Sequence, residues 1–289
     1  MTNAVVWYDH DSSSVWAVAD SLLTAISKNG DHKSVSRVTD QAMKVLRLKV
    51  GAWGVTENSI AGGPMLGYEV GMVYAGAVTP ALMTYSAAAM MLDNLHPQTK
   101  ENSQIRTPDL SAVADLIRHL SERYTKDASV GYAAGRAPFC EFVIFGIAPD
   151  DMLNCRPLEC YWIHPEFNQN KEFSQVAQPI DLLKGEVAVI GDDTESLRAE
   201  IKSLQDDPGV EEKGKEPRIA LEARMRARKH DTVGGTLQFG VMSTRWGRLD
   251  LYGAMHDQYG DPAQNWLGFD FQTEINSILG MPVKIPSLD

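Results

Sequence analysis

The stretch that decides the fold is residues 1–21, MTNAVVWYDHDSSSVWAVADS. Two β-rich apolar runs, NAVVWY and SVWAVADS, lie on either side of the polar segment DHDSSS. Short apolar runs around a polar turn are typical of a β-hairpin, and Asp9–Asp11 fit a solvated turn better than a metal site. Chain ends usually fray, yet the first strand is expected almost at the end of this chain. One explanation is that the end itself is functional.

Hydrophobic patterns along the rest of the chain alternate between strand-like and helix-like blocks. Helical spacing is clearest where Leu110, Val113, Ile117, Leu120 and Tyr124 recur on one face. Proline near the start of two other segments suits a first helical turn. The expected strands are 43–50, 69–76, 139–147, 158–163, 186–191, 234–242 and 248–253, and the expected helices are 79–95, 109–124, 192–204 and 217–230.

This order of elements predicts an α+β fold. Hairpins favour antiparallel pairing, and paired helices between blocks of strands favour two stacked sheets with helices on each outer face. The expected architecture is a four-layer αββα sandwich of two antiparallel sheets. No boundary stands out, so a single domain is expected over 1–289, with a core at about 2–253 and a C-terminal extension at 254–289.

The charge and hydrophobicity of the chain argue against some classes of binding partner. The formal net charge of −11 argues against nucleic acid, which requires a basic surface. The one local basic run, residues 224–230, is interpreted as a solvated helix face. No stretch is long and apolar enough to cross a membrane, and no signal peptide is recognisable, so no membrane partner and a cytoplasmic location are expected.

The sequence contains no complete motif for binding a cofactor or a metal ion. The segment GVEEKGKE has the spacing of a phosphate-binding loop, but Glu216 replaces the magnesium-binding hydroxyl and no strand precedes it. Neither GxSxG nor HExxH occurs. The three cysteines, Cys140, Cys155 and Cys160, form neither a CxxC pair nor a disulfide framework. The sequence therefore predicts no cofactor and no metal.

A nucleophile at the chain end fits what remains. Thr2 is small enough for an aminopeptidase to remove Met1, which would leave a hydroxyl and a free α-amine on one residue. That amine has a pKa near 8, and a nearby cation would lower it. Lys44 starts an otherwise apolar strand and needs an anion, for which Asp20 is the obvious partner. A backbone N–H at Gly76 would hold the oxyanion.

The sequence resembles the proteasome-like branch of the N-terminal nucleophile hydrolases, which includes proteasome β subunits and their bacterial relatives. The resemblance is carried by the Thr2 strand and by the segments VWAVADS, MKVLRL, YAGAVTPAL, VIGDD and KHDTVGG, within about 2–253. It implies a nucleophile at Thr2, an acidic helper at Asp20, a catalytic lysine at Lys44 and an oxyanion glycine at Gly76. No cofactor is implied.

Three further positions are assigned supporting roles by the resemblance, and two of them depart from the pattern. Asp231 matches the family's aspartate beside the threonine. Gly234 and Asp192 stand where the family has serines that assist the amine. Loss of both hydroxyls removes hydrogen bonds, and the Asp192 carboxylate would raise the pKa of the amine and make it a poorer base near pH 7.

Three functions stay open. The first is a threonine-type peptide or amide hydrolase in a self-compartmentalised homo-oligomer, a ring or a spiral, with peptide or unfolded-protein substrates and a possible ATP-dependent unfoldase. The second is a catalytically inactive proteasome-like scaffold or shell protein. The third is a small-molecule amidase of the wider superfamily.

Overall fold

A computed structural model describes residues 2–29, 32–53, 64–95, 107–130, 138–149, 157–170, 172–228, 230–253, 265–266 and 269–270. The chain divides into two compact units. The first consists of Met1–Leu46, Val189–Val241 and Asp250–Asp289, and the second of Arg47–Ala188 and Met242–Leu249. The single domain expected over 1–289 stays a prediction. Of the extension at 254–289, the described residues are the short paired strands β13 (Asn265–Trp266) and β14 (Phe269–Asp270).

The first unit is built on a five-stranded sheet with the order β10-β1-β2-β11-β12. Strands β1 and β2 form the predicted N-terminal hairpin, antiparallel, with Ala4 opposite Ala19 and Asp9 opposite Ser14. Nearly every residue of both strands is buried, as expected for strands with neighbours on both edges. The strand bounds are β1 Asn3–Asp9, β2 Ser14–Asp20, β10 Ala188–Gly191, β11 Leu237–Ser243 and β12 Leu249–Gly253.

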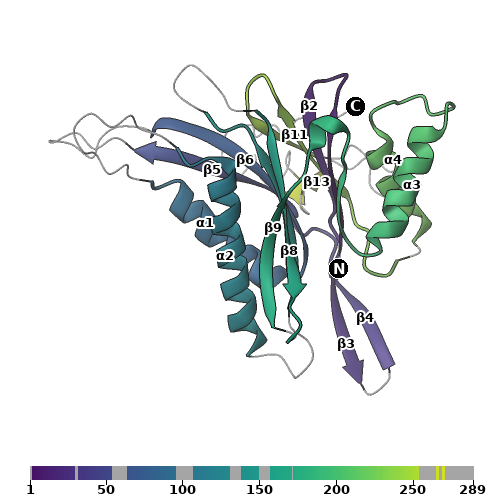
Figure 1. Ribbon diagram of the computed structural model, residues 1–289. Coiled ribbons are helices and arrows are strands. Elements are labelled where there is room, and N and C mark those ends of the chain that lie inside the picture. Colours follow the sequence, from purple (N-terminus) through teal and green to yellow (C-terminus); the bar gives the residue numbers. More distant parts are fainter. Residues whose placement is uncertain are drawn as a thin grey trace, which may run out of the picture. The chain divides into compact units, whose positions relative to one another are not determined.

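A second hairpin in this unit is absent from the sequence expectations. Strands β3 (Leu23–Asn29) and β4 (His32–Thr39) pair with each other as a two-stranded ribbon (Figure 1). Along the chain, this ribbon follows β2 and precedes the segment that carries Lys44. Their sequences, LTAISKN and HKSVSRVT, mix polar and charged residues with few apolar ones. No apolar run therefore marked them as strands.

Helices α3 (Thr194–Asp206) and α4 (Glu216–Ala227) complete the first unit. The two pack on each other, and α4 also packs on β1 and β2 (Figure 1). In α3 the predicted stripe is buried at Leu197 and Ile201, one helical turn apart. Pro217 lies in the first turn of α4, where its missing N–H costs nothing.

The second unit contains the other five-stranded sheet, with the order β5-β6-β7-β8-β9. The pairs β6–β7, β7–β8 and β8–β9 are antiparallel. Strand β9, FSQVAQP, was not predicted, because its polar residues hide the alternation. Gly71 fits against the ring of Phe145, which a Cβ would approach within 2.2 Å. The bounds are β5 Val45–Trp53, β6 Pro64–Gly76, β7 Cys140–Gly146, β8 Glu159–Phe167 and β9 Phe173–Pro179.

Helices α1 (Val78–Leu92) and α2 (Leu110–Ser129) lie on this second sheet. Helix α1 packs on β6 and β7, and α2 packs on β7, β8 and β9. Asp109 caps α2 by accepting a hydrogen bond from Ala112 N at 2.8 Å. Among the helices that the structure describes, none combines the length and the apolar content needed to cross a membrane. The predicted α+β class, with antiparallel sheets that each carry two helices, is confirmed.

Candidate active site

The centre of the candidate site is a buried ion pair between Asp20, the last residue of β2, and Lys44, which precedes β5. Lys44 Nζ lies 3.1 Å from Asp20 Oδ1, and neither side chain is more than 1% exposed. Lys44 Nζ also donates to Leu22 O at 2.7 Å. Asp20 accepts three backbone hydrogen bonds, from Asn3 N at 2.9 Å, Leu22 N at 3.2 Å and Gly234 N at 3.1 Å. The structure therefore brings together Asp20, Lys44 and Gly234.

Burial and mutual attraction act in opposite directions on this pair. Burial raises the pKa of Asp20 above its ordinary value, although the charge of Lys44 and the backbone donors oppose that shift. Burial likewise lowers the pKa of Lys44, against the attraction of Asp20 and of Asp192. A lysine with a lowered pKa holds its proton less tightly than an exposed lysine does.

Thr2 is buried at 3% exposure and directly precedes Asn3, whose backbone N–H donates to Asp20. The carbonyl oxygen of Thr2 accepts a hydrogen bond from Asp192 N at 2.8 Å. Gly191 has a φ of +107°, and a Cβ there would lie 1.6 Å from Thr2 O, so only glycine allows this approach. Asn3 is fixed as well, since its side chain donates to Asp192 O at 2.5 Å. The backbone at Thr2 is thus held by the turn after β10. Met1 lies outside the described residues.

A hydroxyl that the sequence reasoning missed contacts this turn. The Oγ1 of Thr232 donates a short hydrogen bond to the carboxylate of Asp192. Serines were expected at positions 192 and 234, which hold Asp192 and Gly234, and Thr232 supplies a hydroxyl from within the same HDTVGG segment. Its position directly after Asp231 was the available signal. Asp231 itself is exposed.

Arg224, on α4, contacts the same turn after β10. Its guanidinium, 2% exposed, donates to Asp193 O at 3.2 Å and pairs with Glu200 at 3.0 Å. Asp193 has a φ of +48°, a conformation that costs free energy for a residue with a Cβ. The buried guanidinium therefore stabilises a strained turn, and its place in the run 224–230 corrects the expectation of a wholly solvated basic face.

Gly76 belongs to the second unit, at the end of β6. Its φ is +95°, and a Cβ would lie 2.4 Å from Phe139 O. Ala77 N donates to that same carbonyl at 2.8 Å. The position therefore requires glycine for steric reasons within its own unit, whether or not its N–H serves an oxyanion.

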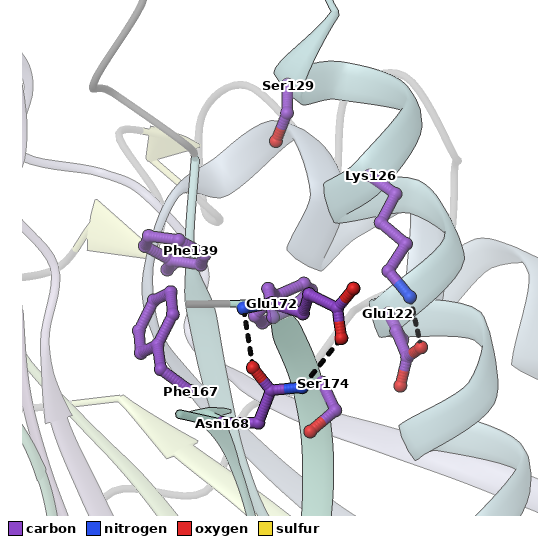
Figure 2. Close-up of a pocket in the computed structure, with 9 residues that line it drawn as sticks. Glu122, Lys126, Ser129, Phe139, Phe167, Asn168, Glu172 and Ser174 are labelled. Atoms are coloured by element: carbon purple, nitrogen blue, oxygen red, sulfur yellow. Dashed lines mark hydrogen bonds and ion pairs between the residues drawn. The ribbon is translucent and has the colours of Figure 1, made fainter. Parts of the chain in front are cut away.

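A pocket in the second unit is a separate feature (Figure 2). It encloses about 740 Å³ between the C-terminal part of α2 and the β8–β9 hairpin. Phe139, Phe167 and Phe173 form its aromatic wall. Its polar groups bond one another: Lys126 pairs with Glu122 at 2.5 Å, and Asn168 donates to Glu172 at 2.7 Å (Figure 2).

Metal-binding clusters and cysteines are two further kinds of candidate group among the residues that the structure describes. No group of three or more histidine, cysteine, aspartate or glutamate side chains is placed there to hold a metal ion. Cys140 and Cys160 are buried and free, and burial raises the pKa of the Cys140 thiol to about 12. Cys155 lies outside the described residues.

Comparison with known proteins places the fold. No protein-family model and no curated protein matches the chain. Among solved structures, the chain is similar to that of the helical assembly of the Anbu complex from Pseudomonas aeruginosa, at 13% identity and a TM-score of 0.52, over 99% of both chains. It is equally similar to a Gly-1 mutant of Anbu from Hyphomicrobium sp. strain MC1, at 13% identity and a TM-score of 0.52, over the whole of both chains.

The fold is proteasome-like. The likeness spans the chain from end to end, so it supports the sandwich architecture as well as the mixed class. At 13% identity it shows the fold and not the activity. The proteasome-like expectation is therefore confirmed at the level of fold, while threonine hydrolysis and the cytoplasmic location stay predictions.

Proposed function

We propose that this protein is a threonine-type hydrolase of peptide or amide bonds, with Thr2 as the nucleophile after removal of Met1. One observation carries the proposal. Asp20 Oδ1 accepts a hydrogen bond from Asn3 N at 2.9 Å and pairs with Lys44 Nζ at 3.1 Å. A fully buried ammonium–carboxylate pair thus lies one residue from the candidate nucleophile. Such a pair stabilises a fold poorly compared with apolar packing, so a chemical role explains its presence.

In the proposed reaction, Thr2 Oγ attacks the carbonyl carbon and its proton passes to the Thr2 amine. The tetrahedral intermediate collapses as the C–N bond breaks, and the leaving amine takes that proton. Water then attacks the resulting ester and gives its proton to the α-amine. The ester C–O bond breaks, Thr2 Oγ takes that proton back, and the acid is released. Lys44 lowers the pKa of the amine through its charge, and Asp20 fixes Lys44. The proposed oxyanion donor is Gly76 N–H.

The supporting residues have roles that the geometry suggests. Asp192 holds the Thr2 backbone through its N–H, and its carboxylate is held by Thr232. Gly234 donates to Asp20 from the segment that follows Asp231. We assign these residues to positioning, since each acts on Thr2, Asp20 or the turn beside them.

Assembly into a homo-oligomer, a ring or a spiral, is part of the proposal. One similar structure is named as a helical assembly. On this chain, α1 exposes three methionines: Met83 is 44% exposed, Met90 73% and Met91 50%. Apolar, adaptable side chains on one helix suit a protein contact. Peptides or unfolded proteins as substrates, and an ATP-dependent unfoldase as a partner, fit such a compartment.

A catalytically inactive scaffold or shell protein is the second candidate. The observation that favours it is the loss of both family serines, at Asp192 and Gly234. A small-molecule amidase is the third. It is distinguished by turnover of acylated small amines without turnover of peptides.

Intact-mass analysis of the purified protein, followed by reaction with a fluorescent peptide vinyl sulfone, tests the proposal. We expect loss of Met1 and a single adduct on Thr2. Thr2→Ala should abolish labelling and turnover and leave the assembly intact, whereas Thr2→Ser should keep measurable labelling. Quantitative retention of Met1 without labelling would establish the scaffold. Undiminished turnover by Thr2→Ala would remove Thr2 from the mechanism.

A further inference from the structure

Gln238 is a buried polar residue on β11 to which the sequence reasoning gave no role. It is 4% exposed, within a strand of otherwise apolar core residues. Its Oε1 accepts hydrogen bonds from Lys44 N at 2.8 Å and from Val45 N at 3.3 Å. Its Nε2 donates to Ala42 O at 2.6 Å. One side-chain amide therefore binds three backbone groups of residues 42–45.

These contacts act on the segment from which Lys44 extends. The Lys44 side chain is held at its far end by Asp20 and Leu22. Its backbone is held by Gln238, and Ala42 N is bonded to Ser21 O at 3.0 Å. A long, flexible lysine is placed reproducibly only if both ends are fixed, because each free rotor would spread the position of Nζ.

We propose that Gln238 is a positioning residue for Lys44: its amide fixes the backbone of residues 42–45 and so places the lysine against Asp20. The geometry stands by itself, while its consequence for catalysis rests on the proposed function. An apolar residue of similar size at 238 would leave the buried N–H groups of Lys44 and Val45 and the half-buried carbonyl of Ala42 without this partner. The segment would then move or admit water, and Lys44 would lose its closed surroundings.

The protonation of Lys44 reports on this role without requiring turnover. The charged groups that face Lys44, among the described residues, are Asp20 at the end of β2 and Asp192 in the turn after β10, while β11 contributes the neutral Gln238. Burial lowers the pKa of Lys44 against the attraction of these two carboxylates. If the segment loosens and water enters, the pKa of Lys44 should rise toward its ordinary value.

The test compares Gln238→Met with Gln175→Met in the full-length protein. Gln175 is an equally buried glutamine, 2% exposed, whose Nε2 donates to Cys140 O at 3.0 Å in the second unit. Each protein is prepared with ¹³C-labelled lysine, and the ¹³Cε signal of Lys44, assigned from its loss in Lys44→Arg, is followed against pH. Thermal melting shows that each variant is folded.

We expect the Lys44 titration midpoint of Gln238→Met to rise toward that of an exposed lysine, and that of Gln175→Met to match the original protein. Labelling of Thr2 by the vinyl sulfone should slow at least tenfold in Gln238→Met only. If Gln238→Met does not fold, Gln238→Asn replaces it, since it keeps a neutral amide but is one methylene shorter and so cannot reach all three backbone groups. Its midpoint should rise as well.

An unchanged Lys44 titration in the folded variant would overturn the positioning role. The two proposals fail separately. If the original protein is never labelled at Thr2 but the Lys44 midpoint moves as expected, the hydrolase proposal is wrong and the role of Gln238 stands. If labelling occurs and the midpoint does not move, the reverse holds.

Discussion

Two aspartate–lysine ion pairs lie at opposite ends of the β1–β2 hairpin, and they differ in almost everything except composition. Asp20 and Lys44 are 3.1 Å apart, with the lysine side chain 1% exposed. Asp9, at the turn end, lies 2.5 Å from Lys215, whose side chain is 20% exposed. In the first pair, three backbone N–H groups donate to the Asp20 carboxylate. The second is open to water along the lysine.

The pKa values follow from this difference. Burial also acts to raise the pKa of Asp9, but the hydrogen bonds from Lys215 and Ser12 and the charge of Lys215 outweigh it and hold that pKa below its usual value. For Asp20, burial wins and the pKa is raised. Lys215 also lies 3.6 Å above the ring of Trp16. The same two residue types thus form an ion pair with a lowered aspartate pKa where water reaches the lysine, and one with a raised aspartate pKa where it does not.

The largest expected effect comes from breaking the enclosed pair with Lys44→Met. The Asp20 carboxylate would stay buried without its cation, which should cost about 3–5 kcal/mol in the free energy of unfolding. Urea denaturation measures this loss, and Thr2 labelling should disappear. The double variant Asp20→Asn with Lys44→Met should regain part of the stability and none of the labelling. A stability equal to that of the original protein would contradict the assignment of a strongly coupled pair.

Breaking the open pair with Lys215→Met should cost only about 1 kcal/mol, because water replaces the ammonium at Asp9 and the contact with Trp16 is partly kept by the thioether. The same urea titration measures it. Labelling of Thr2 should proceed at the original rate. A loss as large as that of Lys44→Met would show that exposure of the lysine does not distinguish the two pairs.

The smallest expected effect is a change in how stability depends on pH. Since the pKa of Asp9 is lowered on folding, the folded state binds fewer protons near pH 4, and Asp9 contributes stability that is lost as pH falls. The raised pKa of Asp20 has the opposite sign, so its contribution weakens as pH rises above its ordinary value of 3.8. Asp9→Asn should flatten the rise of the unfolding free energy with pH in the acid range, and Asp20→Asn should steepen it. Equal slopes in both variants would contradict these directions.

The sequence predicted the parts of this molecule that have a strong local pattern. The first hairpin follows from two apolar runs around a polar turn, and α2 from its stripe of Leu110, Val113 and Ile117. The encounter of Lys44 with Asp20 was expected because a lysine in an apolar strand needs an anion. Asp9 was expected in a solvated turn and is instead buried, because Lys215 arrives from a loop 206 residues away.

The remaining features depend on contacts that no local pattern encodes. Gln238 meets Lys44 across 194 positions of sequence, and Thr232 meets Asp192 across 40. The sequence of β11 does not indicate whether the side chain of its glutamine contacts a backbone segment or water. Strands β3, β4 and β9 were missed for a related reason: polar side chains along a strand erase the alternation on which prediction depends.

The β3–β4 hairpin begins three residues after Asp20 and ends at Thr39, five residues before Lys44. Two hydrogen bonds join the strands of chain at its base, one from Lys44 Nζ to Leu22 O and one from Ala42 N to Ser21 O. Those two hydrogen bonds close the loop at its base. The hairpin beyond them can therefore be lengthened, shortened or replaced at little cost in the free energy of folding. A different hairpin can therefore be inserted at this position, beside the buried Asp20–Lys44 pair, with the two hydrogen bonds at its base kept.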